Sequence, residues 1–292
     1  MDSTLPASPA SPAGPLTGTT ALLVGGAGGI GRATARRLLA DGAHVTLASR
    51  SAERLAAETA RLAPIADAAG GSVRWTTCDS LDAEAVARAV AFTAEPTGRI
   101  DAAVAIAGGG SLAPVLRTSV ATLEQTLRLN VSSFHLVLQH AGAAMLRSGG
   151  GSVVAVSSMQ AAQAAPMFSA YCAAKAALEM LVRCAAEELG VHRVRVNAVR
   201  PGLTRTDTTT GMFENPDVMA AYLTQQPIDR PGEADDVGAA VRYFCGPESS
   251  WVTGQCLAVD GGTMLRRFPD LAGWYRSRLG DEIDRAARGE IL

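Results

Sequence analysis

The stretch ALLVGGAGGIG, residues 21–31, joins a short apolar run to a glycine-rich turn. Residues 21–24 have the length and composition of a buried strand, and a helical pattern covers residues 29–40. Glycines between a strand and a helix permit a tight turn and let backbone N–H groups approach a pyrophosphate. We therefore expect a phosphate cradle here, formed by Gly25, Gly28, Gly29, Ile30 and Gly31; the alternative is a flexible glycine-rich turn.

The same alternation of short apolar runs and helical stretches continues along the chain. It predicts a single α/β domain over residues 18–262, with a Rossmann-like, doubly wound and mostly parallel seven-stranded sheet that carries helices on both faces. In such sheets ligands bind beyond the carboxyl ends of the strands. The expected strands are 21–24, 45–48, 73–76, 102–106, 152–157, 194–199 and 256–259, and a long helical region is expected over about 120–146.

Composition excludes several classes of protein. The 292 residues are 48% hydrophobic and 18% charged, with a net charge of −2, which favours a globular enzyme and argues against nucleic-acid or membrane partners. Five cysteines without C-x-x-C spacing and four scattered histidines predict no metal site and a reducing, cytoplasmic location. Residues 1–17, with proline at every third position from 6 to 15, are predicted to form a disordered tail rather than a signal peptide.

Tyr171 and Lys175 lie one helical turn apart in an alanine-rich helix, so their side chains share one face. A phenol has a pKa of about 10, and a nearby cation lowers it. The pair is thus a candidate acid/base device, although the spacing alone also occurs by chance on surface helices.

The second expected strand ends at Ser49 and Arg50. Many dinucleotide sites place an acidic side chain here for the ribose 2′-OH, whereas a guanidinium at this point binds a 2′-phosphate. Ser49 and Arg50 therefore favour NADP(H) over NAD(H). The alternative is that Arg50 is a solvated residue at the start of the next helix.

Together these features resemble the short-chain dehydrogenase/reductase family over about residues 18–262. The resemblance rests on the glycine turn, on Tyr171-x-x-x-Lys175, and on Ser158 thirteen residues before Tyr171. Further matching segments are Asp79 after the third strand, Leu129-Asn130-Val131, Asn197 to Gly202, and Val259 to Gly262. One departure is Ala105-Ile106-Ala107-Gly108, where the family usually has Asn-Asn-Ala-Gly; this puts the bracing of the sheet in doubt but removes no proton-transfer group.

The resemblance implies hydride transfer between a nicotinamide and a carbonyl or alcohol carbon. Tyr171 would be the general acid or base, Lys175 would tune it and hold the ribose, Ser158 would bind the substrate oxygen, and Asn130 would order a water next to Lys175. The cofactor would also contact residues that follow the strands, namely Asp79, Ser80, Ala107, Gly108, Pro201, Gly202, Thr204 and Thr206. A homotetramer or homodimer is implied as well.

Two segments bear on the substrate. Residues 203–228 are expected to form a mobile lid. The lid residues Met212 and Phe213, with Gln160 and Phe168, suggest an apolar pocket for a hydrophobic or cyclic ketone or alcohol, unless they serve packing or a subunit contact. Residues 263–292 have apolar residues at helical spacing, and would cover the pocket, dock on a neighbouring subunit or pack on their own domain. An alternative from a different class is a dinucleotide-sensing protein without turnover.

Overall fold

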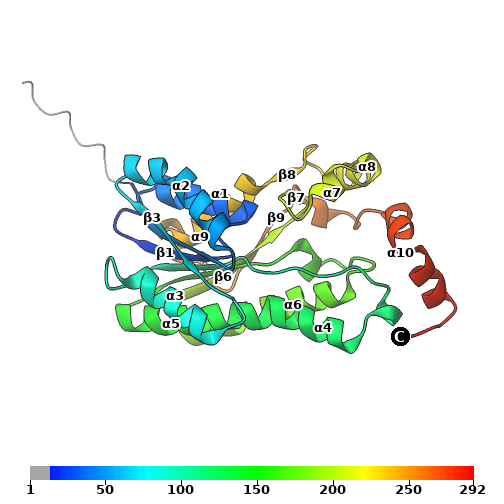
Figure 1. Ribbon diagram of the computed structural model, residues 1–292, viewed down its shortest axis with the longest axis horizontal. Helices are drawn as coiled ribbons and strands as arrows, with labels where there is room; N and C mark the ends of the chain where they lie inside the picture. The colour runs from blue at the N-terminus through cyan, green and yellow to red at the C-terminus, as the bar shows by residue number, and fades with distance from the viewer. Residues whose placement is uncertain (1–13) are drawn as a thin grey trace, which may run out of the picture.

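The computed structural model describes residues 14–292, and a seven-stranded parallel sheet forms its centre (Figure 1). The strand order is β3-β2-β1-β4-β5-β6-β9, and every neighbouring pair is parallel. Chain order reverses between β1 and β4, which opens a crevice at the carboxyl ends of these strands. The predicted sheet is confirmed, with strands β1 (Thr20–Val24), β2 (His44–Ser49), β3 (Ser72–Thr77), β4 (Ala102–Ala105), β5 (Gly151–Val156), β6 (Val194–Pro201) and β9 (Cys256–Val259).

Helices cover both faces of the sheet, as the alternating pattern predicts (Figure 1). One apolar core joins the strands to α1 (Gly29–Ala40), α2 (Ala52–Ala68) and α9 (Ala234–Cys245). The other joins them to helices α3 (Ala83–Ala94), α5 (Ser133–Ser148) and α6 (Ser169–Gly190). Because both faces are buried, the central strands are almost continuously apolar rather than alternating.

The long helical region predicted over about 120–146 is confirmed, and it contains one irregular turn. A π-helical turn, Arg128–Ser132, separates α4 (Val120–Leu127) from α5. At its centre Asn130 is fully buried, and its side-chain amide donates hydrogen bonds to the carbonyl oxygens of Thr126 and Gly109. We attribute the wider turn to these contacts, which draw Asn130 toward the loop after β4. Single π-helical turns of this kind often lie at functional sites.

The predicted lid has its own short elements. These are β7 (Thr204–Arg205), α7 (Thr210–Phe213) and α8 (Pro216–Thr224), and β7 pairs with β8 (Gly232–Glu233). The segment after β9 forms α10 (Ala272–Ala287), which lies at the same end of the molecule as α8 (Figure 1). Lid and C-terminal segment share a third apolar core with the loop after β5, so this segment packs on its own domain.

The prediction of a disordered tail over residues 1–17 is wrong for residues 14–17. Leu16 is buried in the core beneath α1, and its N–H donates to the carbonyl oxygen of Asp41. Residues 14–17 are therefore part of the domain, while the rest of that prediction lies outside the described residues.

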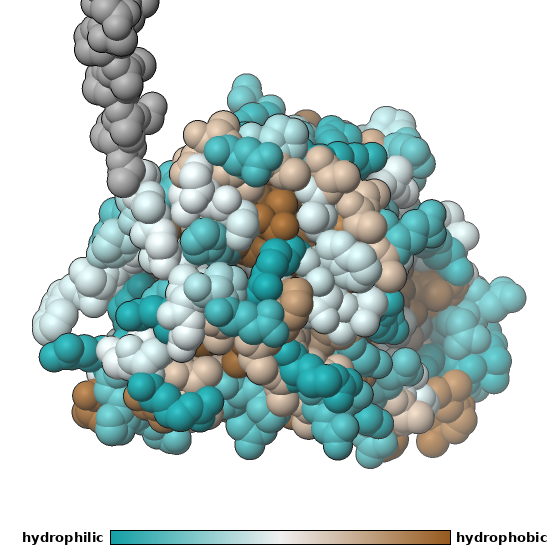
Figure 2. Space-filling view, turned by 60° about the vertical axis from the view of Figure 1, so that its left-hand side comes forward, coloured by the Kyte–Doolittle hydropathy of each residue, from teal (hydrophilic) through white to brown (hydrophobic). Residues whose placement is uncertain are grey.

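The outer surface is mainly polar at one end of the molecule. Figure 2 shows hydrophilic residues over most of that face, with hydrophobic residues in small separate patches. Within residues 14–292, no helix combines the length and apolar character needed to cross a membrane.

Candidate active site

The glycine turn has the conformation that its sequence predicts. Gly25 has φ of +92°, and a Cβ atom there would lie 2.9 Å from the backbone nitrogen of Ala107. A Cβ atom on Gly31 would lie 2.6 Å from the carbonyl oxygen of Gly26. Neither position tolerates a side chain without a shift, so the turn packs closely against the end of β4.

The first turn of α1 suits an anion. Gly28 is its N-cap residue, no side chain caps the first turn, and no acidic residue lies in it. Free N–H groups and the positive end of the helix dipole attract phosphate. Gly28, Gly29, Ile30 and Gly31 therefore fit the pyrophosphate of a nicotinamide dinucleotide.

The end of β2 presents an unpaired cation. Ser49 is partly buried, and Arg50 is exposed. Within residues 14–292 the Arg50 guanidinium has no ion-pair or hydrogen-bond partner, whereas most other arginines of this part of the chain are paired. Ser51 caps α2 by accepting a hydrogen bond from the backbone N–H of Arg54 at 3.3 Å. Asp79, predicted at the adenine, is exposed and accepts a hydrogen bond from the N–H of Leu81.

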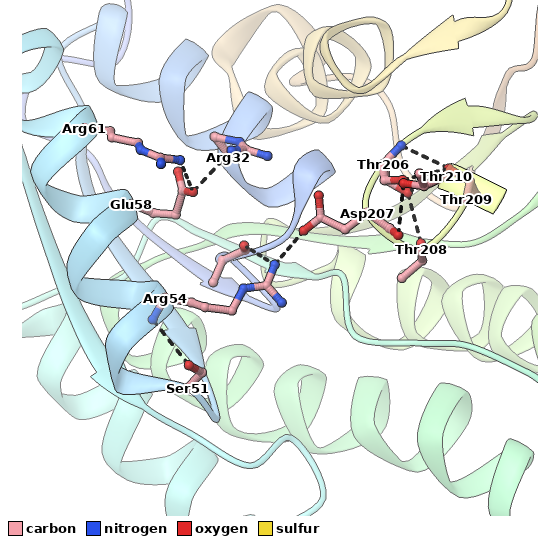
Figure 3. Close-up of polar contacts among 11 residues, drawn as sticks. Arg32, Ser51, Arg54, Glu58, Arg61, Thr206, Asp207, Thr208, Thr209 and Thr210 are labelled. Carbon is pink, nitrogen blue, oxygen red and sulfur yellow. Dashed lines mark hydrogen bonds and ion pairs between the residues drawn. The ribbon is translucent and has the colours of Figure 1, made fainter. Parts of the chain in front are cut away.

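Arg54 connects the glycine turn to the lid (Figure 3). Its Nη2 atom donates to the carbonyl oxygen of Ala27 at 3.2 Å and to Asp207 Oδ2 at 2.7 Å. Beside this contact, Thr206 Cγ2 lies 3.2 Å from the position that a Cβ atom of Gly29 would take. The lid thus rests directly on the predicted phosphate cradle.

The two threonines predicted to contact the cofactor differ in their surroundings. The Thr204 hydroxyl is buried and donates to the carbonyl oxygen of Gly202 at 3.0 Å. The Thr206 hydroxyl faces those of Thr208 and Thr209, at 2.9 and 3.1 Å (Figure 3). Of the two, Thr206 lies at the glycine turn.

Ser158, Tyr171 and Lys175 come together beyond the carboxyl end of β5. Ser158 directly precedes a 3₁₀ turn, Met159–Ala161, and its Oγ atom accepts a hydrogen bond from the N–H of Gln160 at 3.2 Å. The Ser158 side chain lies close enough to Tyr171 to lower the pKa of its hydroxyl. Lys175 Nζ lies 5.6 Å from the centre of the Tyr171 ring and donates to the carbonyl oxygen of Val156 at 2.8 Å. Three of the four side chains predicted to be catalytic therefore form one cluster.

The acidity of this cluster is set by burial. Burial raises the pKa of Tyr171 to about 12, and the Ser158 side chain opposes this rise. Burial also lowers the pKa of Lys175 to about 8, against the opposing charge of Glu179. The spacing of Tyr171 and Lys175 predicts a lowered tyrosine pKa, which is wrong for this structure because the effect of burial is larger. Tyr171 therefore holds its proton at neutral pH, as a proton donor must.

Asn130 holds the loop after β4 against the cluster. Its Oδ1 atom accepts from the N–H of Gly109 at 3.2 Å, and both amide hydrogens are donated to carbonyl oxygens. A Cβ atom on Gly108 would lie 2.7 Å from Asn130 Oδ1 and 2.9 Å from Lys175 Nζ. A glycine at 108 thus lets the loop approach both side chains. The water-ordering role of Asn130 stays a prediction.

This packing predicts a difference between two neighbouring glycines. We expect Gly108→Ala to lower kcat/KM about tenfold or more, because the added methyl group must displace Asn130 or Lys175, and misplaced catalytic groups are costly. Gly109→Ala is the matched control, since its Cβ atom would meet only Leu129 at 3.7 Å. Steady-state kinetics and thermal unfolding of both variants would measure this, and equal activities would contradict the assigned packing.

The residues predicted to bind substrate lie around the third apolar core. The Phe168 ring centre is 6.2 Å from that of Tyr171, and Gln160 is buried next to Ser158. Met212 and Phe213 pack on the core from the lid, although the outer side of the Phe213 ring is covered by Arg205 at 4.3 Å. Phe168 and Gln160 therefore lie next to catalytic residues, whereas Met212 and Phe213 lie farther along the third apolar core, and their contact with substrate stays a prediction.

Sequence reasoning missed one buried ionic group. Glu179 is 2% exposed, and it accepts hydrogen bonds from Ser157 Oγ at 2.8 Å and from Arg200 Nε at 2.6 Å. It lies one helical turn after Lys175, as Lys175 lies one turn after Tyr171. This i, i+4, i+8 spacing on one helix face is the signal that would have found it.

Comparisons with known proteins agree with this geometry. The family model described as enoyl-(acyl carrier protein) reductase matches residues 25–264. Galactitol 2-dehydrogenase (L-tagatose-forming) of Cereibacter sphaeroides is 35% identical over 250 residues, which are 85% of this chain and 95% of that protein. A short-chain type dehydrogenase/reductase from Mycobacterium ulcerans has a TM-score of 0.89 and 36% identity, covering 92% of this chain and 98% of its own.

A second solved structure shows a ligand complex. It is a 7α-hydroxysteroid dehydrogenase with NADH and 7-oxo glycochenodeoxycholic acid, with a TM-score of 0.79 and 30% identity over 85% of this chain and 94% of its own. The family model, the sequence relatives and the solved structures all describe oxidoreductases or reductases. The chain belongs to the short-chain dehydrogenase/reductase family, and it is an oxidoreductase that acts on an alcohol or carbonyl group with a nicotinamide dinucleotide.

Proposed function

We propose that the protein transfers a hydride between NADP(H) and the carbonyl or secondary alcohol carbon of a hydrophobic or cyclic compound. The observation that carries this proposal is the cluster of Ser158, Tyr171 and Lys175 beyond β5, next to an uncapped helix N-terminus that suits a pyrophosphate. The bound nicotinamide supplies or accepts the hydride, and the protein supplies position and protons.

Each side chain of the cluster has a proposed task. Tyr171 donates a proton to the substrate oxygen in reduction and accepts it in oxidation, and its pKa of about 12 favours the donor role at neutral pH. The Ser158 hydroxyl donates to the same substrate oxygen. The Lys175 ammonium holds the nicotinamide ribose and favours the ionised form of Tyr171 in oxidation. Asn130 fixes the loop after β4 beside Lys175.

Arg50 supports NADP(H) as the cofactor. It is exposed, it has no partner among the described residues, and it follows Ser49, which brings no negative charge to repel a 2′-phosphate. The alternative is NAD(H), which the 7α-hydroxysteroid dehydrogenase holds as NADH in its structure.

The third apolar core supports a hydrophobic substrate. Methionine, phenylalanine, leucine and tyrosine side chains surround the catalytic cluster on the lid side. A polyol substrate is the alternative suggested by the relative named galactitol 2-dehydrogenase. A polyol needs several hydrogen-bonding side chains, and an apolar core offers few of them.

One experiment tests both the proposed cofactor and the proposed substrate class. Initial rates with NADPH and with NADH, against bulky cyclic ketones and polar sugars, are expected to favour NADPH and the cyclic ketones. Arg50→Asp is expected to lower the NADPH over NADH preference about 10- to 100-fold, since charge-assisted hydrogen bonds are worth about 1.5–3 kcal/mol. Arg61→Asp is a control, because this exposed arginine pairs with Glu58 away from the end of β2. A clear preference for sugars, or an unchanged cofactor ratio in Arg50→Asp, would refute the respective half.

We also propose a homodimer or homotetramer in the cytoplasm. Trp251 is 99% exposed near the edge strand β9, and Val120 and Met180 are exposed on α4 and α6; such apolar residues favour contacts with another subunit. All five cysteines are free, which supports a reducing compartment.

A further inference from the structure

The C-terminal segment forms a roof over the catalytic end of the domain. Six buried residues make up one apolar cluster, which we call the roof cluster: Met159, Leu203, Val218, Tyr222, Leu271 and Tyr275. Met159 directly follows Ser158, and Leu203 directly follows Pro201-Gly202. The cluster thus brings the catalytic loop, the end of β6, the lid and the C-terminal segment together.

Polar contacts fix the roof at both of its ends. Gln163, between the catalytic serine and tyrosine, donates from Nε2 to the carbonyl oxygen of Arg266 at 2.9 Å. Arg266 Nη1 in turn donates to the carbonyl oxygen of Thr224 at the end of α8. Farther along, buried Arg117 donates to Glu282 Oε2 at 2.5 Å and to the carbonyl oxygen of Ile291 at 3.0 Å. These contacts give the roof a defined position over the site.

Tyr275 is the unusual residue of the roof cluster. Its side chain is 3% exposed, and its hydroxyl is buried without a hydrogen-bond partner in the described part of the chain. Tyr275 belongs to the same apolar cluster as Met159, which directly follows Ser158, and this places the ring near the catalytic loop. A buried hydroxyl without a partner destabilises a protein, and phenylalanine would pack as well without that cost. The hydroxyl therefore has no structural task that the contacts show.

We propose that Tyr275 is a substrate-recognition residue whose hydroxyl binds a second oxygen of the substrate, away from the reacting carbonyl. This proposal rests on the proposed function and sharpens its substrate class to a hydrophobic cyclic ketone, or the corresponding alcohol, with a further carbonyl or hydroxyl group. Because the roof-cluster side chains are buried, the roof must move apart to admit the ring system of such a molecule, which these apolar side chains then contact. The substrate oxygen then satisfies the one buried hydroxyl of the cluster that has no partner within residues 14–292.

Paired substrates test the assignment. Each pair shares a ring system and differs by one distal oxygen: cyclohexanone with 1,4-cyclohexanedione, and a steroid ketone with and without a distal hydroxyl. We expect wild type to prefer the oxygenated member of at least one pair. Tyr275→Phe should lower kcat/KM for that member about fivefold, the effect of one neutral hydrogen bond, and leave the other member unchanged. Tyr222→Phe is the matched control, a buried tyrosine of the same cluster whose hydroxyl is not among the buried unpaired groups.

Stability provides the second readout. Because the Tyr275 hydroxyl has no partner, Tyr275→Phe should keep or raise the thermal unfolding midpoint. A lower midpoint, or an equal effect on both members of every pair, would overturn the recognition role and leave the proposed function standing. Wild-type enzyme that reduces no ketone of the panel with either cofactor would contradict the proposed function itself, and the Tyr275 assignment with it.

Discussion

Replacing Tyr171 with phenylalanine is expected to lower kcat/KM by about 10²–10⁴-fold, the usual contribution of a general acid or base. The change removes the phenol hydroxyl, whose pKa the Ser158 side chain lowers, and keeps the ring. The ring itself has structural contacts: a Cβ atom on Gly110 would lie 2.8 Å from Tyr171 Cβ, and the Phe168 ring is close by. The variant should therefore fold normally and lose the proton-transfer step alone.

Cofactor binding separates this loss from a damaged site. The glycine turn and Arg50 lie on other elements than Tyr171 and are not altered, so the dissociation constant for NADPH, followed by its fluorescence, should change less than about threefold. Tyr243→Phe on α9 is a control for the generic loss of a phenol. Turnover of Tyr171→Phe near the wild-type level would contradict the catalytic assignment. Tight cofactor binding by a wild type that turns over no alcohol or ketone would instead favour a dinucleotide sensor.

The fold was readable from the sequence because local patterns and tertiary packing agree. Apolar runs such as residues 21–24 and 152–156 are uninterrupted since both faces of a parallel sheet are buried. Gly25 has a left-handed backbone conformation and no space for a side chain. A glycine at this position in the sequence therefore indicates the turn by itself. The prediction failed for residues 14–17 because their composition is typical of a disordered tail, although one leucine among them is buried.

The sequence predicts which residues form the cluster, but it does not predict their burial or their pKa values. Spacing along a helix places Tyr171 beside Lys175, but it carries no information on burial, which decides both pKa values. The π-helical turn at Asn130 depends on contacts with a loop about twenty residues earlier, which no local pattern records. The unpaired hydroxyl of Tyr275 is likewise a property of the packed molecule, since the sequence shows only an apolar residue at helical spacing.

Replacing Glu179 with glutamine is expected to lower the free energy of unfolding by about 3 kcal/mol. The buried carboxylate accepts hydrogen bonds from Ser157 and Arg200, and removing one partner of a buried ion pair leaves the other charge uncompensated. We place the cost at the lower end of the usual range because the Arg200 side chain is 20% exposed. Denaturant unfolding measures the change. Glu84→Gln, which breaks the exposed pair with Arg88, is the control and should cost less than about 1 kcal/mol.

The same substitution should change how stability depends on pH, through Lys175. Burial brings the Lys175 pKa from its ordinary 10.5 down to about 8, and the Glu179 charge opposes this, so its loss lowers the pKa further. Between the folded and unfolded pKa values the unfolded chain binds more protons, and stability therefore rises with pH over that window. In Glu179→Gln the rise in stability begins below pH 8, because the Lys175 pKa of the folded protein is lower. Unfolding midpoints from pH 7 to about 9.5 would show this rise starting earlier than in wild type.

A direct titration of Lys175 completes the test, because it is the only lysine in the chain. Lysine labelled with ¹³C at the ε carbon therefore gives one NMR signal, whose chemical shift follows the charge of Lys175 although the side chain is buried. The pH midpoint of this shift should be lower in Glu179→Gln than in wild type. An unchanged midpoint with a large loss of stability would mean that Glu179 braces Arg200 and Ser157 without tuning Lys175. A lowered midpoint together with slower turnover at alkaline pH would instead show that Glu179 keeps Lys175 charged for catalysis.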